Sequence, residues 1–458
     1  MAVVSMTKFK TLTYFKFKVF SLLTILFLGF FLAGCGGGGE GSPNNPISSV
    51  TYSISFYDEN LDFITTRQIE EGTDISSVEP YSTAWFKANE TSPLPTNYNL
   101  NESVTIYAIP NVQEITTQEE LVAISANVIT LRHKYILLND ITLAEGKSGF
   151  DSISGWTPIG DYTNRFKGIF NGNGYKITNI WINKPNVNNI GLFGYIEYGQ
   201  IKNIGVETAK GKGIKGNSLV GGITGYINRG NISNSYTVGN ISGSSDYVGG
   251  IAGHINRSSI YNSYTVGNIS GSSDYVGGIA GYIEYGGNIA NSYSIGYISG
   301  NSNVGGIAGY IDYGKNISNS YSIANISGYG YYVGGIAGYS VVGTIQNNVA
   351  INPFITGKLY VNRVIGTTRS GSSSINNFAS IGAVGGADYN GKTNSFSNNN
   401  NAQYHGIDKT VDLLKKKNTY LSGSLDWKFD GYNDNEPWVW GAFSDYPYPT
   451  FYWQVQKP

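Results

Sequence analysis

A segment that returns every 28 or 29 residues constrains this chain of 458 residues more than any other feature. Val-Gly-Gly-Ile, followed by Thr or Ala and then Gly, begins at positions 220, 248, 276, 304 and 333. A fixed period between about 20 and 50 residues is typical of solenoids, propellers and other arrays. Propeller blades run to about 40–45 residues with four strands each, so the shorter period favours a solenoid.

Each repeat holds three short apolar segments separated by Gly, Asn and Ser. Gly pairs and β-branched residues oppose helix formation, so these segments predict strands. The chain is therefore predicted to be all-β: a right-handed parallel β-helix with one coil per ~28 residues and short helical caps. Coils about 4.8 Å apart place like residues above one another. The Gly pairs are expected at corners that need positive φ or close backbone packing. An interior aliphatic ladder is expected from Ile223, Ile251, Ile279, Ile307 and Ile336.

A second ladder is predicted from an asparagine that recurs in the pattern Ile-x-Asn. This asparagine stands at positions 203, 234, 262, 291, 319, 347 and 377. Amides stacked in register hydrogen-bond to one another along a β structure. In four coils the pattern extends to Asn-Ser-Tyr, beginning at Asn234, Asn262, Asn291 and Asn319.

The segments outside the repeat predict several further parts. Their expected bounds are 1–34 for a signal peptide, 35–49 for a flexible tether, 50–111 for a small β domain, 112–189 for an N-terminal cap and first coils, 190–380 for the repeat solenoid and 381–458 for a C-terminal cap. Thr117-Gln-Glu-Glu120 has the capping-box pattern, which predicts a short helix from Thr117 to about Asn127. A second short helix is expected at 409–417, and the aromatic tail is expected to pack on the last coil.

The N-terminal segment carries an export signal. Lysines precede an apolar run from Val19 to Leu32, which is too short for a membrane span of about 20 residues. The run ends on Leu32-Ala-Gly-Cys35, which resembles the lipobox of bacterial lipoproteins. That resemblance implies lipidation of Cys35 and anchoring at the cell surface, and the absence of Asp at position 36 favours the outer membrane. The alternative is an ordinary signal peptide and a free cysteine.

Two stretches resemble known families. Tyr135-Ile-Leu-Leu-Asn-Asp-Ile, Gly155-Trp-Thr-Pro-Ile-Gly, Phe166-Lys-Gly-Ile-Phe-Asn-Gly-Asn-Gly and Gly191-Leu-Phe-Gly follow one another as in bacterial surface proteins with the GLUG motif. The resemblance covers about residues 112–455 and implies an adhesin-like surface protein. Residues 53–57, 71–73, 84–86 and 104–108 resemble the β-grasp-like internalin B-repeat; an unrelated small β sandwich is the alternative.

Composition argues against several classes of function. The formal net charge is −1, and removal of a lysine-containing signal peptide makes the mature chain more acidic, which disfavours a nucleic-acid partner. Some GLUG-bearing relatives are zinc peptidases, but their His-Glu-x-x-His motif is absent here. We expect no cofactor. Glu284 and Asp312 occupy equivalent positions one coil apart and form a weak candidate for a cation such as Ca²⁺; a solvated surface slot is the alternative.

Tyrosine is the most suggestive residue type, with 36 in the chain. Facing outward, periodic tyrosines form strips suited to sugars or partner proteins; facing inward, they fill the core. Three slots recur: Tyr195, Tyr226, Tyr282, Tyr310 and Tyr339, with His254 between them; Tyr247, Tyr275 and Tyr332; and Tyr198, Tyr285 and Tyr313. We expect a non-enzymatic, lipid-anchored surface protein with an adhesin-like face for a glycan or a host or matrix protein. A carbohydrate-active enzyme and a ligand-free spacer are the alternatives.

Overall fold

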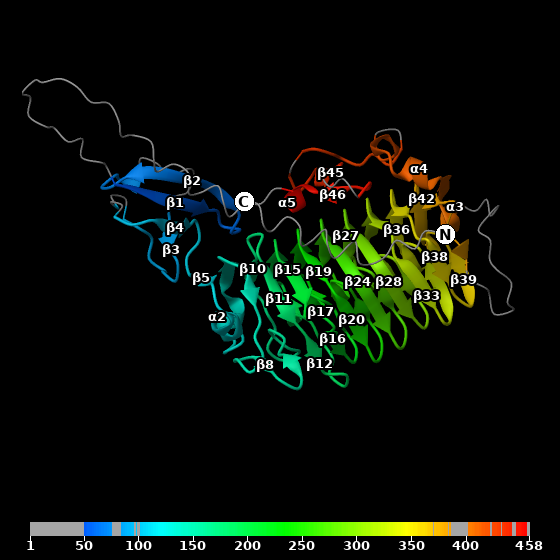
Figure 1. The fold of residues 1–458 in the computed structure, drawn as a ribbon, viewed down its shortest axis with the longest axis horizontal. Coiled ribbons are helices and arrows are strands. Elements are labelled where there is room, and N and C mark those ends of the chain that lie inside the picture. The colour runs from blue at the N-terminus through cyan, green and yellow to red at the C-terminus, as the bar shows by residue number, and fades with distance from the viewer. Residues whose placement is uncertain are drawn as a thin grey trace, which may run out of the picture. The chain divides into compact units, whose positions relative to one another are not determined.

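The computed structural model describes residues 50–75, 84–95, 98, 101–369, 371–382, 384–385, 402–421, 424–431, 433–441 and 446–455. The predicted signal peptide, the tether and Cys35 lie outside these residues. The repeat forms an all-β solenoid whose coils run from green to yellow in Figure 1. All the residues described belong to one compact unit, Val50–Pro458.

Four sheets form the walls of the solenoid. The seven-stranded sheet contains β13 (Phe193–Glu197), β17 (Thr224–Asn228), β22 (Ala252–Asn256), β26 (Ala280–Glu284), β30 (Ala308–Asp312), β35 (Ala337–Ser340) and β40 (Ile365–Thr368). The ten-stranded sheet contains β5 (Val112–Ile115), β6 (Lys134–Leu137), β10 (Ile169–Asn171), β14 (Gln200–Lys202), β18 (Asn231–Ser233), β23 (Ser259–Tyr261), β27 (Asn288–Ala290), β31 (Asn316–Ser318), β36 (Gly343–Gln346) and β41 (Ser372–Ile375).

The other two walls differ in size. The five-stranded sheet contains β21 (Val248–Gly249), β25 (Val276–Gly277), β29 (Val304–Gly305), β34 (Tyr331–Gly334) and β39 (Leu359–Asn362). The eighteen-stranded sheet contains β7 (Ile141–Thr142), β8 (Phe150–Asp151), β9 (Gly155–Trp156), β11 (Lys176–Ile180), β12 (Ile182–Asn183), β15 (Gly205–Thr208), β16 (Gly213–Gly216), β19 (Tyr236–Val238), β20 (Asn240–Gly243), β24 (Tyr264–Gly271), β28 (Tyr293–Gly300), β32 (Tyr321–Ser322), β33 (Asn325–Gly328), β37 (Val349–Ala350), β38 (Phe354–Thr356), β42 (Phe378–Ser380), β43 (Val384–Gly385) and β44 (Ile407–Lys409).

One predicted apolar segment is therefore two strands. The segment that begins Val276-Gly-Gly-Ile contributes β25 to one wall and β26 to the next. The Gly pair stands at this corner, but neither glycine has positive φ. A Cβ added to Gly277 would collide with the carbonyl oxygen of Ala280, so close backbone packing is what requires glycine here.

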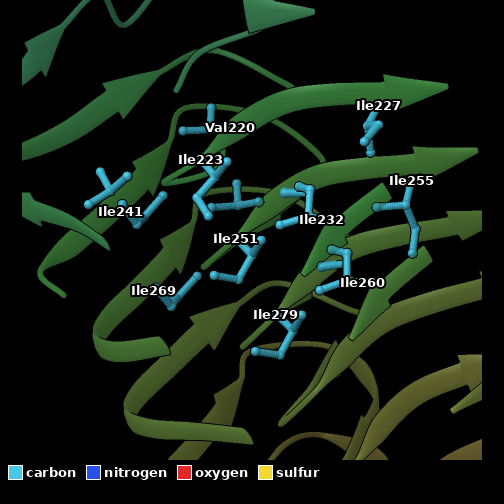
Figure 2. Packing of buried hydrophobic residues seen from close by; sticks show 14 of the residues in the cluster. Val220, Ile223, Ile227, Ile232, Ile241, Ile251, Ile255, Ile260, Ile269 and Ile279 are labelled. Carbon is cyan, nitrogen blue, oxygen red and sulfur yellow. The ribbon is translucent and has the colours of Figure 1, made fainter. Parts of the chain in front are cut away.

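Strands of successive coils pair with like residues in register. Val248 pairs with Val276, and Ile255 pairs with Ile283. The predicted isoleucine ladder is confirmed, because Ile223, Ile251, Ile279, Ile307 and Ile336 are all fully buried. Figure 2 shows part of it beside further interior ladders, such as Ile227 above Ile255 and Ile232 above Ile260. Burying each such side chain contributes roughly 1.5–3 kcal/mol, so the periodic core holds the coils together.

The asparagine ladder also forms, with one correction. The Nδ2 atoms of Asn234, Asn262 and Asn291 each donate to the Oδ1 of the asparagine one coil earlier at 3.1 Å. These residues and Asn319 lie in the left-handed region, with φ between 47° and 51°, which asparagine tolerates well. At the C-terminal end the next member is Asn376 and not Asn377, because Gln346 pairs with Ile375.

Short helices and a small sheet lie outside the coils. The capping box is confirmed: Thr117 caps α2 (Gln118–Ala123) and Glu120 bonds back to it, although the helix ends earlier than predicted. A 3-10 helix, η3 (Thr130–Arg132), follows. The small domain has the strand order β2 (Phe63–Glu70), β1 (Thr51–Tyr57), β4 (Val104–Tyr107), β3 (Phe86–Lys87). Its parallel β1–β4 pair between antiparallel neighbours agrees with the predicted β-grasp-like sheet.

The C-terminal tail only begins on the last coil, in contrast to the prediction. Helix α3 (Ala402–His405) contacts β40 and β41, and β44 pairs with β42. The described residues between 410 and 455, which we call the strap, then lie along the flank of earlier coils (orange and red in Figure 1). The strap contains α4 (Val411–Leu414), η4 (Lys417–Thr419), β45 (Trp438–Val439), β46 (Thr450–Phe451) and α5 (Tyr452–Val455).

The strap covers a tyrosine column that the sequence analysis did not count among its slots. The third residues of the four Asn-Ser-Tyr motifs stack with ring centroids 4.8–5.0 Å apart: Tyr236, Tyr264, Tyr293 and Tyr321. The strap lays a second column beside them, with steps of 4.6–5.2 Å: Trp453, Phe451, Trp438 and Trp427. Tyr264 stacks on Trp453 at 5.7 Å, for example. The recurring Asn-Ser-Tyr therefore marks where the tail docks.

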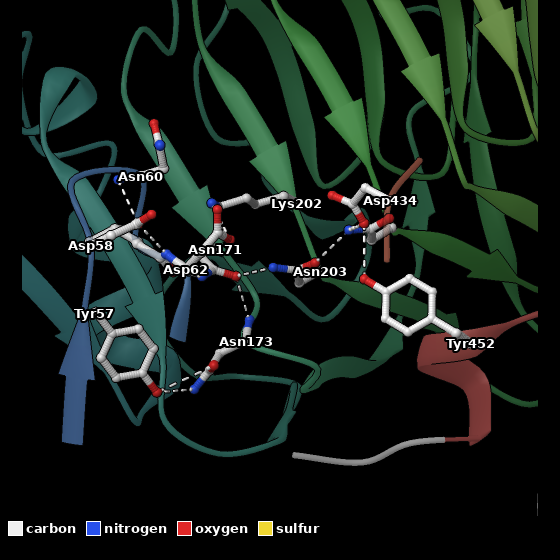
Figure 3. Close-up of polar contacts among 12 residues, drawn as sticks. Tyr57, Asp58, Asn60, Asp62, Asn171, Asn173, Lys202, Asn203, Asp434 and Tyr452 are labelled. Carbon is white, nitrogen blue, oxygen red and sulfur yellow. Dashed lines mark hydrogen bonds and ion pairs between the residues drawn. The ribbon is translucent and has the colours of Figure 1, made fainter. Parts of the chain in front are cut away.

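Polar contacts join the small domain, an early coil and the strap (Figure 3). Lys202 Nζ lies 2.6 Å from Asp62 Oδ1 of the small domain. On the next coil Asn234 Nδ2 donates to Asp434 Oδ1 of the strap at 2.9 Å, and the Tyr452 hydroxyl donates to the same oxygen at 2.9 Å. The strap thus ends close to the point where the small domain meets the solenoid.

Candidate binding face

Two of the predicted tyrosine slots meet on the outer surface where the five-stranded sheet turns into the seven-stranded sheet. Alternation along each strand explains their direction: Ile283 points into the core and is 1% exposed, while its neighbours Tyr282 and Glu284 point outward. Apart from Tyr195, which is buried, the rings are half-buried, and Tyr360, which extends the second slot, is exposed. We call this surface the aromatic face. Its first column is Tyr195, Tyr226, His254, Tyr282, Tyr310 and Tyr339, and its second is Tyr247, Tyr275, Tyr332 and Tyr360.

The rings of the aromatic face pack in a herringbone. Within the columns, Tyr282 and Tyr310 lie 5.2 Å apart at 5°, and Tyr247 and Tyr275 lie 5.1 Å apart at 8°. Across the columns, Tyr275 meets Tyr310 at 5.1 Å and 82°. Parallel rings this far apart are offset, and offset and edge-to-face pairs are the arrangements aromatic rings prefer. Each ring is therefore held by its neighbours, and the half-buried side chains leave part of each ring open to solvent.

The second column occupies a backbone position that does not favour tyrosine. Tyr247, Tyr275, Tyr332 and Tyr360 have φ of 63°, 62°, 63° and 56°, in the left-handed region. Asn303, at the same position of another coil, has φ 55° and is the residue type that tolerates this conformation. A bulky residue there costs about 1–2 kcal/mol. Local preference does not explain four tyrosines, and strain of this kind points toward function.

A polar column borders the aromatic face. Glu197, Asn228, Asn256, Glu284 and Asp312 stand at equivalent positions. Glu284 contacts His254 Nε2 at 3.1 Å and accepts from Asn256 Nδ2 at 2.9 Å, while Asp312 accepts from the Tyr282 hydroxyl at 3.0 Å. The two carboxylates of the cation candidate thus each bond to the preceding coil. Within the residues described, no group of three or more His, Cys, Asp or Glu could hold a metal ion.

Ionisation does not alter the aromatic face at neutral pH. Burial raises the pKa of Tyr195 and of Tyr310 to about 12, so both hydroxyls stay protonated. Burial also lowers the pKa of His254, although the nearby Glu284 opposes that shift. The face therefore presents neutral hydroxyl groups and a neutral imidazole, beside the amides and carboxylates of the polar column.

The third predicted slot forms the most exposed aromatic column. Tyr198, Tyr285 and Tyr313 are 54%, 50% and 56% exposed at the corner beside the polar column. The two coils between them carry Arg229 and Arg257 at the same position, which the sequence analysis overlooked. The sequence could have revealed these two arginines, because both recur with the period of the tyrosine slot. Arg229 lies over the ring of Tyr198 at 5.5 Å, and Arg257 over that of Tyr285 at 5.4 Å.

Comparisons with known proteins give a short match. No protein-family model matches the chain. A segment of 76 residues is 47% identical to a protein of Evansella cellulosilytica described as "Putative Gly-rich membrane protein". That segment is 16% of this chain and 8% of the relative, so the likeness concerns a small part of both. In the part of the chain that the structure describes, no helix has the length and hydropathy of a membrane span.

Proposed function

We propose that this protein is a lipid-anchored, GLUG-type surface protein whose solenoid binds an extracellular glycan through the aromatic face, without catalysis. The observation that carries the proposal is the herringbone of tyrosines on the outer surface of successive coils. It repeats the same rings at a step of about 5 Å. A polymer of regularly spaced sugar rings can meet equivalent side chains on successive coils. Partly exposed aromatic rings and hydroxyl groups are what sugars bind.

The acids near the face favour display over catalysis. Glycoside cleavage needs two carboxylates with separate roles on either side of the bond. Glu284 and Asp312 instead make hydrogen bonds to His254, Asn256 and Tyr282 in the preceding coils. These bonds give both carboxylates a structural role, because they tie each coil to the one before it.

Anchoring through Cys35 places the face outside the cell in this proposal. The lipobox resemblance supports it, as does the description of the matched relative as a membrane protein. Radioactive palmitate should label the wild-type chain and not a Cys35→Ala variant. Equal labelling of the two would rule out this anchor.

The binding proposal is tested on glycan and matrix-protein arrays with the full chain in detergent. A Tyr282→Ala/Tyr310→Ala variant should lose at least tenfold in affinity for the glycans that the wild type binds. Tyr329→Ala is the matched control, because Tyr329 is 76% exposed and lies outside the aromatic face. Binding to matrix proteins alone would contradict a glycan ligand. Silence on both arrays would favour a structural spacer. Shortening of a bound glycan, abolished by Glu284→Gln, would show an enzyme.

A further inference from the structure

The corner column beside the aromatic face combines exposed rings with two unpaired cations. Its members are Tyr198, Arg229, Arg257, Tyr285 and Tyr313, which follow one another on five successive coils. All five lie in the left-handed region, with φ between 41° and 61°. This backbone conformation turns each side chain away from the wall at the corner, so the column is a continuous exposed strip.

The two arginines stand on neighbouring coils and lean apart. Strands of neighbouring coils are about 4.8 Å apart. Arg229 reaches back to the ring and hydroxyl of Tyr198 on the preceding coil, while Arg257 reaches forward to the ring of Tyr285 on the following coil. Among the residues described, neither guanidinium has a carboxylate within 4.0 Å. Both side chains are exposed, so each guanidinium keeps N–H donors open to an anion from solution.

The nearest acids are directed elsewhere. Glu197 is held by Arg165 at 2.6 Å and by Lys167 at 2.7 Å, which lowers its pKa. Glu284 and Asp312 bond into the aromatic face, as described above. In the two coils that carry arginine, the preceding residue is Asn228 or Asn256, whereas the coils that carry tyrosine have an acid there. Positive charge is therefore concentrated on two coils of a chain whose formal net charge is −1.

We infer that this corner is the subsite for the anionic groups of an acidic polysaccharide, with Arg229 and Arg257 each holding one carboxylate or sulfate. This inference rests on the proposed glycan-binding function and names the ligand class. The planar guanidinium binds carboxylate and sulfate oxygens through paired N–H donors. Tyr198 on one side and Tyr285 and Tyr313 on the other offer exposed ring faces for the adjoining sugars. The polymer chain would run along the column, across the coils.

Affinity electrophoresis of the full chain in detergent tests the inference. The probes are polygalacturonate for carboxylate, dextran sulfate for sulfate, and dextran and xyloglucan as neutral polymers. Arg229→Gln/Arg257→Gln should weaken retention by at least one anionic polymer tenfold or more and leave retention by neutral polymers unchanged. Arg229→Lys/Arg257→Lys keeps the charge but loses the planar fork, so its retention should fall between wild type and the glutamine variant. Lys210→Gln/Lys215→Gln is the matched control, since it removes the same charge from exposed positions on another wall.

The outcomes separate this inference from the proposed function. Anionic polymers that retain the glutamine variant and the lysine control equally would overturn the arginine subsite. In that case a loss of neutral-polymer retention in Tyr282→Ala/Tyr310→Ala would still uphold the aromatic face. Retention by anionic polymers alone, lost both in the glutamine variant and in Tyr282→Ala/Tyr310→Ala, supports both; loss in the glutamine variant only would uphold the subsite and contradict the aromatic face. If no polymer retains the wild type, both fall.

Discussion

Replacing Asn262 by alanine should destabilise the solenoid about as much as deleting a large core side chain. The side chain is fully buried, donates to Asn234 Oδ1 at 3.1 Å and to the Asp434 carbonyl oxygen at 3.2 Å, and accepts from Asn291 at 3.1 Å. Each bond contributes about 1 kcal/mol net, so the three contribute about 3 kcal/mol. Alanine would also have to adopt φ near 51°, which costs about 1–2 kcal/mol. We expect a total cost of about 4–5 kcal/mol from these two contributions.

Two further variants separate the two contributions. Asn262→Gly loses the same hydrogen bonds but accepts the left-handed backbone, so its cost should be smaller, about 3 kcal/mol. The exposed Asn231→Ala should change stability by less than about 0.5 kcal/mol. Urea unfolding followed by circular dichroism gives the free energies, and amide hydrogen exchange shows whether neighbouring coils open first, as arrays of repeats do. A cost below about 1 kcal/mol for Asn262→Ala would refute the amide ladder as a source of stability. Equal costs for Ala and Gly would refute the backbone argument.

Three other variants test the remaining contacts. Burial lowers the pKa of His254, so the folded chain binds fewer protons than the unfolded chain, and stability should fall as pH drops below the unfolded pKa of about 6.5. His254→Tyr should therefore lessen the decrease of the urea midpoint between pH 7.5 and pH 5.5. An unchanged decrease would contradict this role of His254. Trp438→Ala should cost about 3–5 kcal/mol of stability and expose the strap to limited proteolysis, while the β-sheet signal in circular dichroism persists. A strap that stays protected would show that ring stacking does not hold it on the solenoid. Gly277→Ala should lower the thermal midpoint by forcing the corner apart, at a cost of about 1–3 kcal/mol; an unchanged midpoint would mean that the corner can relax.

Periodicity made much of the solenoid predictable. Residues one period apart must stack, so the buried column of Ile223 to Ile336 and the amide ladder through Asn234 and Asn262 followed from spacing alone. The capping box at Thr117 was equally readable, because its two hydrogen bonds are local. The prediction of Asn377 as a member of the amide ladder is wrong. One added residue in the last coil shifts the motif, so that Asn376 takes the ladder position.

The direction and covering of the tyrosines could not be read from spacing. Tyr282 and Tyr293 both recur with the same period, yet Tyr282 lies half-buried on the aromatic face and Tyr293 lies under the strap. What separates them is a contact with Phe451, far away in the sequence, which no repeat encodes. Arg229 and Arg257 differ from the slot in residue type but share its position, so a comparison of tyrosines alone does not include them.

The strap gives this solenoid something that an open array lacks, a fixed length. Coils of 28 residues can be gained or lost in whole units without disturbing the register between those that remain. The strap, however, leaves the last coil through α3 and β44 and ends beside Asn234, and its four aromatic rings match the four coils from Tyr321 back to Tyr236. A deleted coil would leave one of these rings without a partner and pull Asp434 away from its asparagine. The tail therefore fixes the number of coils between the last coil and the coil of Asn234.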